Sequence, residues 1–215
     1  LFPFLSATIR RMIEVIYFDL GKVIVDFDYA VAAQQLLQVT PLPLPEIIEV
    51  LSDANLIFEY ETGKLSSSEY RRTVSQRLQM DVSMGRFQQL WGNMFLPQPL
   101  LSESLLMHLK QTYRLILLSN TNEIHFEYIA RRYPILQHIQ ERLLSYQVGC
   151  MKPDPRIFEL AIQRAGVPPD KIFFTDDRSE NIEAARQAGI QAAQFHSEGS
   201  LIQDMEQVGI SVNSH

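Results

Sequence analysis

The sequence has a single cysteine, Cys150, among its 215 residues. One cysteine cannot form a disulfide within the chain, which is typical of a protein from a reducing compartment, so we expect a cytoplasmic location. No cysteine or histidine lies near Cys150 at the spacing of metal ligands, and we therefore interpret this residue as structural.

Long apolar runs and basic residues are also scarce. No run approaches the ~18 apolar residues of a membrane helix, so we expect no membrane partner. The 19 basic and 25 acidic residues give a net charge of −6, and an acidic surface does not favour nucleic acid or anionic membranes. In the apolar opening, residues 1–11, the arginines follow the apolar part, which is the reverse of a signal peptide. We expect this opening to lie outside the fold.

A short apolar run that ends in an acid organises the chain. Val15 to Phe18 is β-branched and aromatic, which predicts a buried parallel strand. Asp19 follows where this strand stops. In open parallel sheets, ligands bind outside the carboxyl ends of the strands. Asp19 is therefore either a cap for the next turn or a catalytic group.

The rest of the chain divides into two parts. Residues 28–97 are rich in helical patterns, including the capping box from Ser66 to Glu69 and an apolar face around Trp91. Predicted helices then alternate with apolar strands, over residues 99–110, 115–118, 123–132, 142–145, 155–165, 172–174, 180–188, 191–195 and 201–208. Such alternation predicts a doubly wound parallel α/β sheet, built from residues 12–27 and 98–215, with residues 28–97 as a small all-helical insertion after the first strand.

Polar residues follow three of the predicted strands. Asp19 follows the first strand, Ser119 the second, and Asp176 and Asp177 the fourth, while Lys152 precedes a helix. In a parallel sheet all of them meet at one edge. Packed carboxylates need a cation, and Mg²⁺, which takes oxygen ligands, fits that need. A metal, a lysine and a hydroxyl around one carboxylate are typical of phosphoryl transfer.

Four segments resemble, in order, the motifs of the haloacid dehalogenase (HAD) superfamily. They are Phe18-Asp19-Leu20-Gly21-Lys22-Val23, Leu118-Ser119-Asn120-Thr121, Met151-Lys152-Pro153-Asp154 and Phe174-Thr175-Asp176-Asp177. The resemblance spans residues 15–195, and the insertion falls where that family places its helical cap. It implies a HAD-like, Rossmannoid phosphatase that acts on a small phosphorylated metabolite.

The resemblance also implies a role for each matching residue. Asp19 would be the nucleophile that forms an aspartyl-phosphate, Ser119 would hydrogen-bond a phosphoryl oxygen, and Lys152 would neutralise both the nucleophile and the phosphate. Asn120 and Thr121 would help to bind the substrate. The implied Mg²⁺ ligands are Asp19, the backbone carbonyl of Gly21, Asp176 and Asp177.

Gly21 departs from the family pattern. Most phosphatases of the superfamily carry an aspartate there, which protonates the leaving group, and such a general acid contributes ~10²–10⁴-fold. A substrate with a good leaving group, such as an anomeric sugar phosphate, would need it less. Alternatively Asp26, Asp28 or His125 replaces it, or the protein is a slow or inactive relative. Segments 18–26 and 119–122 resemble a HAD subgroup that includes a bacterial α-D-glucose-1-phosphate phosphatase and also has glycine here, which favours a sugar phosphate.

Two other functions stay open. A 2-haloacid dehalogenase would use Asp19 on a halogen-bearing carbon without a metal, but the adjacent Asp176 and Asp177 would then repel each other. Such dehalogenases also usually carry an aromatic residue at the position of Gly21. A non-catalytic phosphate-binding relative is favoured by Gly21 alone.

The sequence leaves several supporting residues undecided. Residues 28–97 are expected to act as a lid that excludes water and selects the substrate. Tyr60, Glu59 and Arg72 are candidates for substrate contacts, and nothing in the sequence chooses among them. Asn181 is either an additional residue of the metal site or an exposed residue in the first turn of its helix.

Overall fold

The computed structural model describes residues 12–212, so the extension expected at residues 1–11 lies outside the described residues. Five strands form one parallel sheet in the order β5–β4–β1–β6–β7. They are β1 (Val15–Phe18), β4 (Arg114–Ser119), β5 (Glu141–Leu144), β6 (Ile172–Asp176) and β7 (Gln191–Gln194). The continuous apolar sequence of β1 suits its central, fully buried place.

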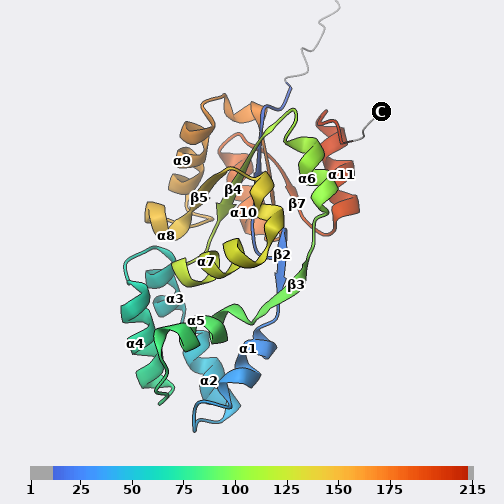
Figure 1. Cartoon of the computed structure of the whole chain (residues 1–215). Helices are drawn as coiled ribbons and strands as arrows, with labels where there is room; N and C mark the ends of the chain where they lie inside the picture. The colour runs from blue at the N-terminus through green and yellow to red at the C-terminus, as the bar shows by residue number, and fades with distance from the viewer. Residues whose placement is uncertain (1–11, 213–215) are drawn as a thin grey trace, which may run out of the picture.

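Helices cover both faces of the sheet because side chains alternate along each strand. Ile16 and Phe18 pack in one apolar cluster with α6 (Glu103–Leu109), α7 (Glu123–Arg132) and α11 (Glu198–Gln207). Val15 and Tyr17 pack on the other face with α9 (Pro155–Ala165) and α10 (Ser179–Gln187). Figure 1 shows α6 and α11 together on one side and α9 on the other. The doubly wound α/β fold expected from the sequence is confirmed.

Five helices lie between β1 and α6 along the chain, and we call them the helical insertion. They are α1 (Tyr29–Leu36), α2 (Leu44–Leu51), α3 (Ala54–Glu61), α4 (Ser67–Arg77) and α5 (Met84–Gly92). They pack around an apolar cluster of their own, together with Ile124 of α7. The predicted capping box of Ser66 and Glu69 is present at the start of α4. In Figure 1 the helical insertion gathers below the sheet.

A two-stranded antiparallel ribbon joins the helical insertion to the sheet. It consists of β2 (Val25–Phe27) and β3 (Phe95–Pro99), with Phe27 opposite Phe95. The prediction of helices alone for residues 28–97 is therefore wrong at its end, and so is a helix starting at residue 99. Pro97 and Pro99 stop a helix, but proline is tolerated in edge strands. The next helix, α6, starts only after Ser102, whose hydroxyl accepts a hydrogen bond from the Leu105 N–H.

The remaining elements are short. Helix α8 (Ser145–Val148) follows β5, and the 3₁₀ turns η1 (Pro134–His138) and η2 (Pro169–Lys171) precede β5 and β6. Among residues 12–212, no helix combines the length and the apolar character that a membrane crossing requires.

Candidate active site

The carboxyl edge of the sheet brings the predicted strand-end residues together. Strands β4, β1 and β6 are direct neighbours, and Ser119 and Asp176 are the last residues of the outer two. Asp19 follows β1, and its N–H donates to the Thr175 carbonyl at 2.9 Å, which extends the ladder by one residue. Asp19, Ser119 and Asp176 are thus anchored by regular strand pairing and not by a free loop.

Lys152 lies at the centre of this edge. Its Nζ donates to Asp19 Oδ1 at 2.9 Å, to Asp176 Oδ2 at 2.5 Å and to the Leu118 carbonyl at 2.8 Å. The residue is only 2% exposed. Burial alone would lower the pKa of Lys152, but the carboxylates of Asp19 and Asp176 outweigh it and raise that pKa. A full positive charge is therefore fixed beside the proposed nucleophile.

The loop after β4 holds this lysine in place. The Asn120 amide makes two hydrogen bonds with the Lys152 backbone, accepting from its N–H and donating to its carbonyl, both at 2.8 Å. The Thr121 N–H donates to Ser145 Oγ at 3.0 Å, and that hydroxyl donates to the Thr121 carbonyl at 2.9 Å. The Ser119 hydroxyl makes only a long, 3.3 Å contact with the Asn120 carbonyl. Substrate binding by Asn120 and Thr121 stays a prediction.

Three carboxylates crowd the same edge. Within residues 12–212, Asp19, Asp176 and Asp177 each place a ligand oxygen within 4.8 Å of the other two. Burial raises the pKa of Asp19 to about 7, although Lys152 acts against it, and burial together with the Asp176 charge raises the pKa of Asp177. A divalent cation would relieve this repulsion, and oxygen ligands fit Mg²⁺. The metal-ligand role of the Gly21 carbonyl stays a prediction.

Asn181 is buried behind Asp176 and is not an exposed helix residue. Its Nδ2 donates to Asp176 Oδ1 at 2.9 Å, and the Arg178 N–H donates to the same oxygen at 2.9 Å. Both oxygens of Asp176 are thus engaged by the protein. Among the described residues, the Asn181 Oδ1 atom is buried without a hydrogen-bond partner.

The family model of the haloacid dehalogenase-like hydrolases matches residues 13–189. The chain belongs to this family. It is 30% identical over 189 residues to D-ribitol-5-phosphate phosphatase of Bacteroides thetaiotaomicron, which covers 85% of this chain and 92% of that protein. The HAD resemblance of the four motifs is thereby confirmed, and the chain is a hydrolase.

Solved HAD structures share the fold. A HAD family enzyme of Bacteroides thetaiotaomicron, in complex with magnesium and inorganic phosphate, superposes with a TM-score of 0.77 at 25% identity, over 86% of this chain and 95% of that one. An L-2-haloacid dehalogenase of Xanthobacter autotrophicus matches with a TM-score of 0.61 at 15% identity, over 93% of this chain and 85% of that one. The second likeness shows the fold alone.

Gly21 of this HAD hydrolase has no room for a side chain. A Cβ at this position would lie 2.9 Å from Cε1 of Phe27. The Phe27 ring makes edge contacts with Tyr29 and Phe95, with centroids 5.1 and 6.1 Å apart. The ring therefore occupies the space that an acid at position 21 would need.

The sequence suggested three substitutes for that acid. Asp26 accepts a hydrogen bond from Lys22 Nζ at 2.5 Å, which lowers the pKa of Asp26 and keeps it ionised. Asp28 is exposed and caps α1 by accepting from the Ala30 N–H at 2.8 Å. Burial lowers the pKa of His125 to about 4, so this side chain is neutral at neutral pH. Asp26 and His125 therefore hold no proton to donate near pH 7, and Asp28 is engaged at the surface as a helix cap.

A chamber of about 630 Å³ lies between the helical insertion and the start of α7. Its walls are mainly apolar and aromatic side chains from α1, α2, α3 and α5, among them Leu36 and Trp91. Polar side chains also line it, Glu61 from the helical insertion and Asn122 and His125 from the core. Of the insertion residues suggested by the sequence, Tyr60 is buried in this lining, whereas Glu59 and Arg72 are exposed.

Glu61 is the residue that sequence reasoning missed. Burial raises the pKa of Glu61 to about 7, with a further contribution from the Asp19 charge, while Arg178 and Lys152 act against it. The carboxyl is therefore within electrostatic range of the proposed nucleophile. No local pattern distinguishes Glu61 from Glu59, because its burial arises only when the helical insertion docks on the core.

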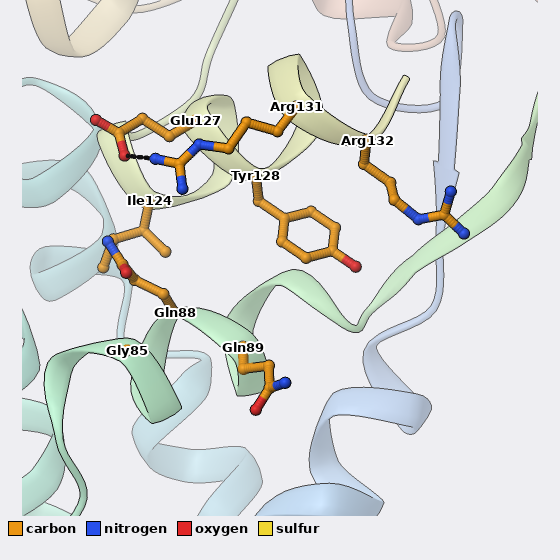
Figure 2. A pocket seen from close by; sticks show the side chains of 8 residues that line it. All are labelled: Gly85, Gln88, Gln89, Ile124, Glu127, Tyr128, Arg131 and Arg132. Atoms are coloured by element: carbon orange, nitrogen blue, oxygen red, sulfur yellow. Dashed lines mark hydrogen bonds and ion pairs between the residues drawn. The ribbon is translucent and has the colours of Figure 1, made fainter. Parts of the chain in front are cut away.

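A second cleft, of about 440 Å³, lies between α5 and α7 (Figure 2). The Tyr128 ring extends from α7 toward α5, and Arg131 pairs with Glu127 at 2.7 Å. This cleft shares no lining residue with the chamber, and the strand-end residues line neither of them. The chamber is the cavity related to the candidate active site, because Glu61 lines it and lies within electrostatic range of Asp19.

Proposed function

We propose that this HAD hydrolase is a Mg²⁺-dependent phosphatase that hydrolyses a small phosphomonoester through an aspartyl-phosphate on Asp19. The observation that carries the proposal is the buried Lys152 ammonium between Asp19 and Asp176. A fixed positive charge beside a carboxylate suits a phosphate dianion, which must approach that carboxylate despite like charge.

The residues would divide the work as follows. The Asp19 carboxylate attacks phosphorus while Lys152 holds it in place and offsets its charge. The Ser119 hydroxyl, buried and only weakly engaged in the protein, donates to a phosphoryl oxygen. Asn120 positions Lys152 through its backbone. Mg²⁺ would be held by Asp19, the Gly21 carbonyl, Asp176 and Asp177, and when bound it supplies positive charge toward the phosphoryl oxygens.

We also propose that residues 28–97 form a cap over a core made of residues 12–27 and 98–215. The separate apolar cluster of the helical insertion and the ribbon that connects it to the sheet support this division. Such a cap excludes water from the reaction and selects the alcohol part of the substrate. A cytoplasmic location belongs to the same proposal, supported by the single, unpaired Cys150.

Two substrate classes are supported by different observations. The name of the Bacteroides thetaiotaomicron relative supports a sugar or polyol phosphate. The mainly apolar chamber supports a phosphomonoester whose alcohol carries an apolar part. Activity toward D-ribitol 5-phosphate and glucose 1-phosphate, compared with alkyl phosphates of increasing length, separates the two classes.

The activity is tested by phosphate release from p-nitrophenyl phosphate and from that panel, with Mg²⁺ and with EDTA. We expect release that depends on Mg²⁺ and is absent in Asp19→Asn. Binding of inorganic phosphate without release from any substrate would instead favour the non-catalytic relative.

The dehalogenase alternative has a direct test. A halide electrode would detect chloride from 2-chloropropionate. Chloride release without phosphate release would overturn the phosphatase proposal. The three crowded carboxylates favour the metal-dependent reaction, because a dehalogenase would leave their repulsion unrelieved.

A further inference from the structure

The proposed reaction lacks a proton donor at the usual position. When phosphorus leaves an alcohol, the departing oxygen develops negative charge and needs a proton. Gly21 has no side chain to supply one, and the Phe27 ring fills the adjacent space. Asp26 is held ionised by Lys22, and Asp28 caps a helix at the surface. The donor must therefore come from another part of the chain.

Glu61 is held at the junction between the helical insertion and the core by contacts on both sides of it. On one side, the Tyr60 hydroxyl accepts a hydrogen bond from the Ile124 N–H at 3.3 Å. On the other side, Gly63 packs so closely on Tyr146 that a Cβ would lie 2.2 Å from its carbonyl oxygen. Both core residues belong to elements that directly follow strands of the sheet.

A third contact strengthens this docking. Ser67, in the first turn of α4, donates to Glu123 Oε2 at 2.5 Å and lies 2.9 Å from the Tyr60 hydroxyl. The segment around Glu61 is thus fixed against α7 and α8, the helices that follow β4 and β5. Of these two strands, β4 is the direct neighbour of β1, whose end carries Asp19.

The surroundings of Glu61 suit proton transfer. It lines the chamber, where the alcohol part of a substrate would lie. The charged and titratable groups that act on it are Asp19 after β1, Lys152 before α9, Arg178 before α10, Tyr29 of α1 and Tyr70 of α4. Burial is the largest influence and raises the pKa of Glu61 to about 7. Glu61 therefore keeps its proton to a higher pH than an ordinary carboxyl, which suits a group that donates and accepts a proton near neutral pH.

We infer that Glu61 is the general acid and base of this HAD hydrolase, supplied by the helical insertion in place of an acid at position 21. The inference rests on the proposed phosphatase function. In the first step Asp19 forms a bond to phosphorus, the bond from phosphorus to the alcohol oxygen breaks, and the Glu61 proton goes to that oxygen. In the second step the Glu61 carboxylate takes a proton from water, which attacks phosphorus. Asp19 is released, and inorganic phosphate and protonated Glu61 are formed.

This assignment changes the inference from Gly21 to the leaving group of the substrate. With a proton donor in the helical insertion, the leaving group need not be a good one. Phosphates of ordinary primary alcohols, whose alkoxides are poor leaving groups, then become suitable substrates. Gly21 no longer favours an anomeric sugar phosphate over them.

Leaving-group dependence in Glu61→Gln tests the inference. The two substrates are p-nitrophenyl phosphate, whose phenolate leaves without a proton, and an unactivated alkyl phosphate that the wild-type protein hydrolyses, with D-ribitol 5-phosphate tried first. We expect the alkyl phosphate to react about 10²–10⁴-fold more slowly in single turnover. The first equivalent of p-nitrophenolate should still appear in a fast burst, followed by slow turnover, because hydrolysis of the aspartyl-phosphate has lost its base.

Controls separate proton transfer from a structural role. Glu59→Gln, on the exposed side of the same helix, should leave both rates unchanged. Inhibition by inorganic phosphate should be equal in wild type and Glu61→Gln. In Glu61→Ala, added formate should restore part of the alkyl phosphate activity, because a small acid can occupy the vacated space and donate the proton.

Several outcomes would overturn the assignment. They are equal slowing of the burst and of the alkyl phosphate reaction, no slowing of either, or no rescue by formate. A wild-type protein that releases phosphate from neither substrate would refute the proposed function itself. Loss of both activities in Asp19→Asn, with the leaving-group difference absent in Glu61→Gln, would refute only the role of Glu61.

Discussion

The carboxyl edge of the sheet and the helical insertion are built in opposite ways. At the sheet edge the buried groups are charged, and Lys152 has three partners between 2.5 and 2.9 Å. In the helical insertion the buried groups are mainly rings and aliphatic chains, with Phe87 and Trp91 stacked at 3.9 Å. Hydrogen bonds and ion pairs, which are directional, fix the proposed reacting groups. Apolar packing, which is not directional, shapes the wall of the chamber. We therefore expect substitutions at the edge to abolish the reaction and substitutions in the insertion, other than at Glu61, to change its specificity.

The largest effect should come from Asp19→Asn. The amide keeps the volume of the side chain but removes the nucleophile, so turnover should fall to the background rate while the fold persists. Phosphate release and thermal unfolding, measured on the same preparation, check both parts. Substantial turnover in this variant would show that Asp19 is not the attacking group.

Lys152→Met should destabilise the protein by about 3–5 kcal/mol at neutral pH, because Asp19 and Asp176 would be left buried without their cation. Urea unfolding gives the free energy. The control is Lys22→Met, which breaks the more exposed pair with Asp26 and should cost less than about 1 kcal/mol. Equal losses would mean that burial does not distinguish the two lysines.

Gly63→Ala and Gly92→Ala test how the helical insertion docks, and each should cost about 1–3 kcal/mol. At Gly63, where φ is +70°, a Cβ meets the Tyr146 backbone carbonyl, so no change of side chain can relieve the clash. At Gly92 a Cβ would lie 2.1 Å from the Tyr128 ring, so Tyr128→Ala should rescue Gly92→Ala. Rescue of Gly63→Ala by Tyr146→Ala would contradict this account.

His125→Gln should give the smallest effect, visible only against pH. The pKa of His125 falls from 6.5 to about 4 on folding. Between pH 6.5 and about pH 4, His125 therefore binds a proton in the unfolded chain but not in the folded chain. The stability that this provides is complete above pH 6.5 and is lost as pH falls toward 4. Over that window we expect the unfolding free energy of the variant to change by about 1–2 kcal/mol less than that of the wild type.

The control for this pH experiment is His196→Gln, because His196 is exposed. It should reproduce the wild-type pH dependence of the unfolding free energy. If His125→Gln followed the same curve as well, the buried imidazole would not be the group that links stability to pH.

The sequence predicted well which residues meet at the carboxyl edge of the sheet, because the pairing of parallel strands determines it. The run Val15 to Phe18 fixes β1, and parallel pairing then places Ser119 and Asp176 beside Asp19. The bounds of α9 were also predicted, since Asp154 caps its start and Gly166 follows its end. These features depend on local pattern and on one rule about parallel sheets.

Other features depend on contacts distant in sequence and could not be predicted. Glu61 is half-buried where the helical insertion docks on the core, next to the close contact of Gly63 with Tyr146. The space beside Gly21 is filled by Phe27, whose place depends on pairing with β3. That ribbon itself was missed because its prolines resemble the end of a helix.

The ribbon of β2 and β3 has a consequence for conformational entropy. Phe27 and Phe95 face each other across it, so the points where the chain leaves and rejoins the core are already joined. Loop-closure entropy grows only logarithmically, by about 0.6 kcal/mol for each doubling of length. The loop-closure entropy of an insertion with five helices is therefore only modestly larger than that of a short hairpin turn. This junction can accept longer or shorter inserts while the carboxyl edge keeps its geometry, so specificity can change without rebuilding that edge, provided that the insert still supplies a proton donor in the place of Glu61.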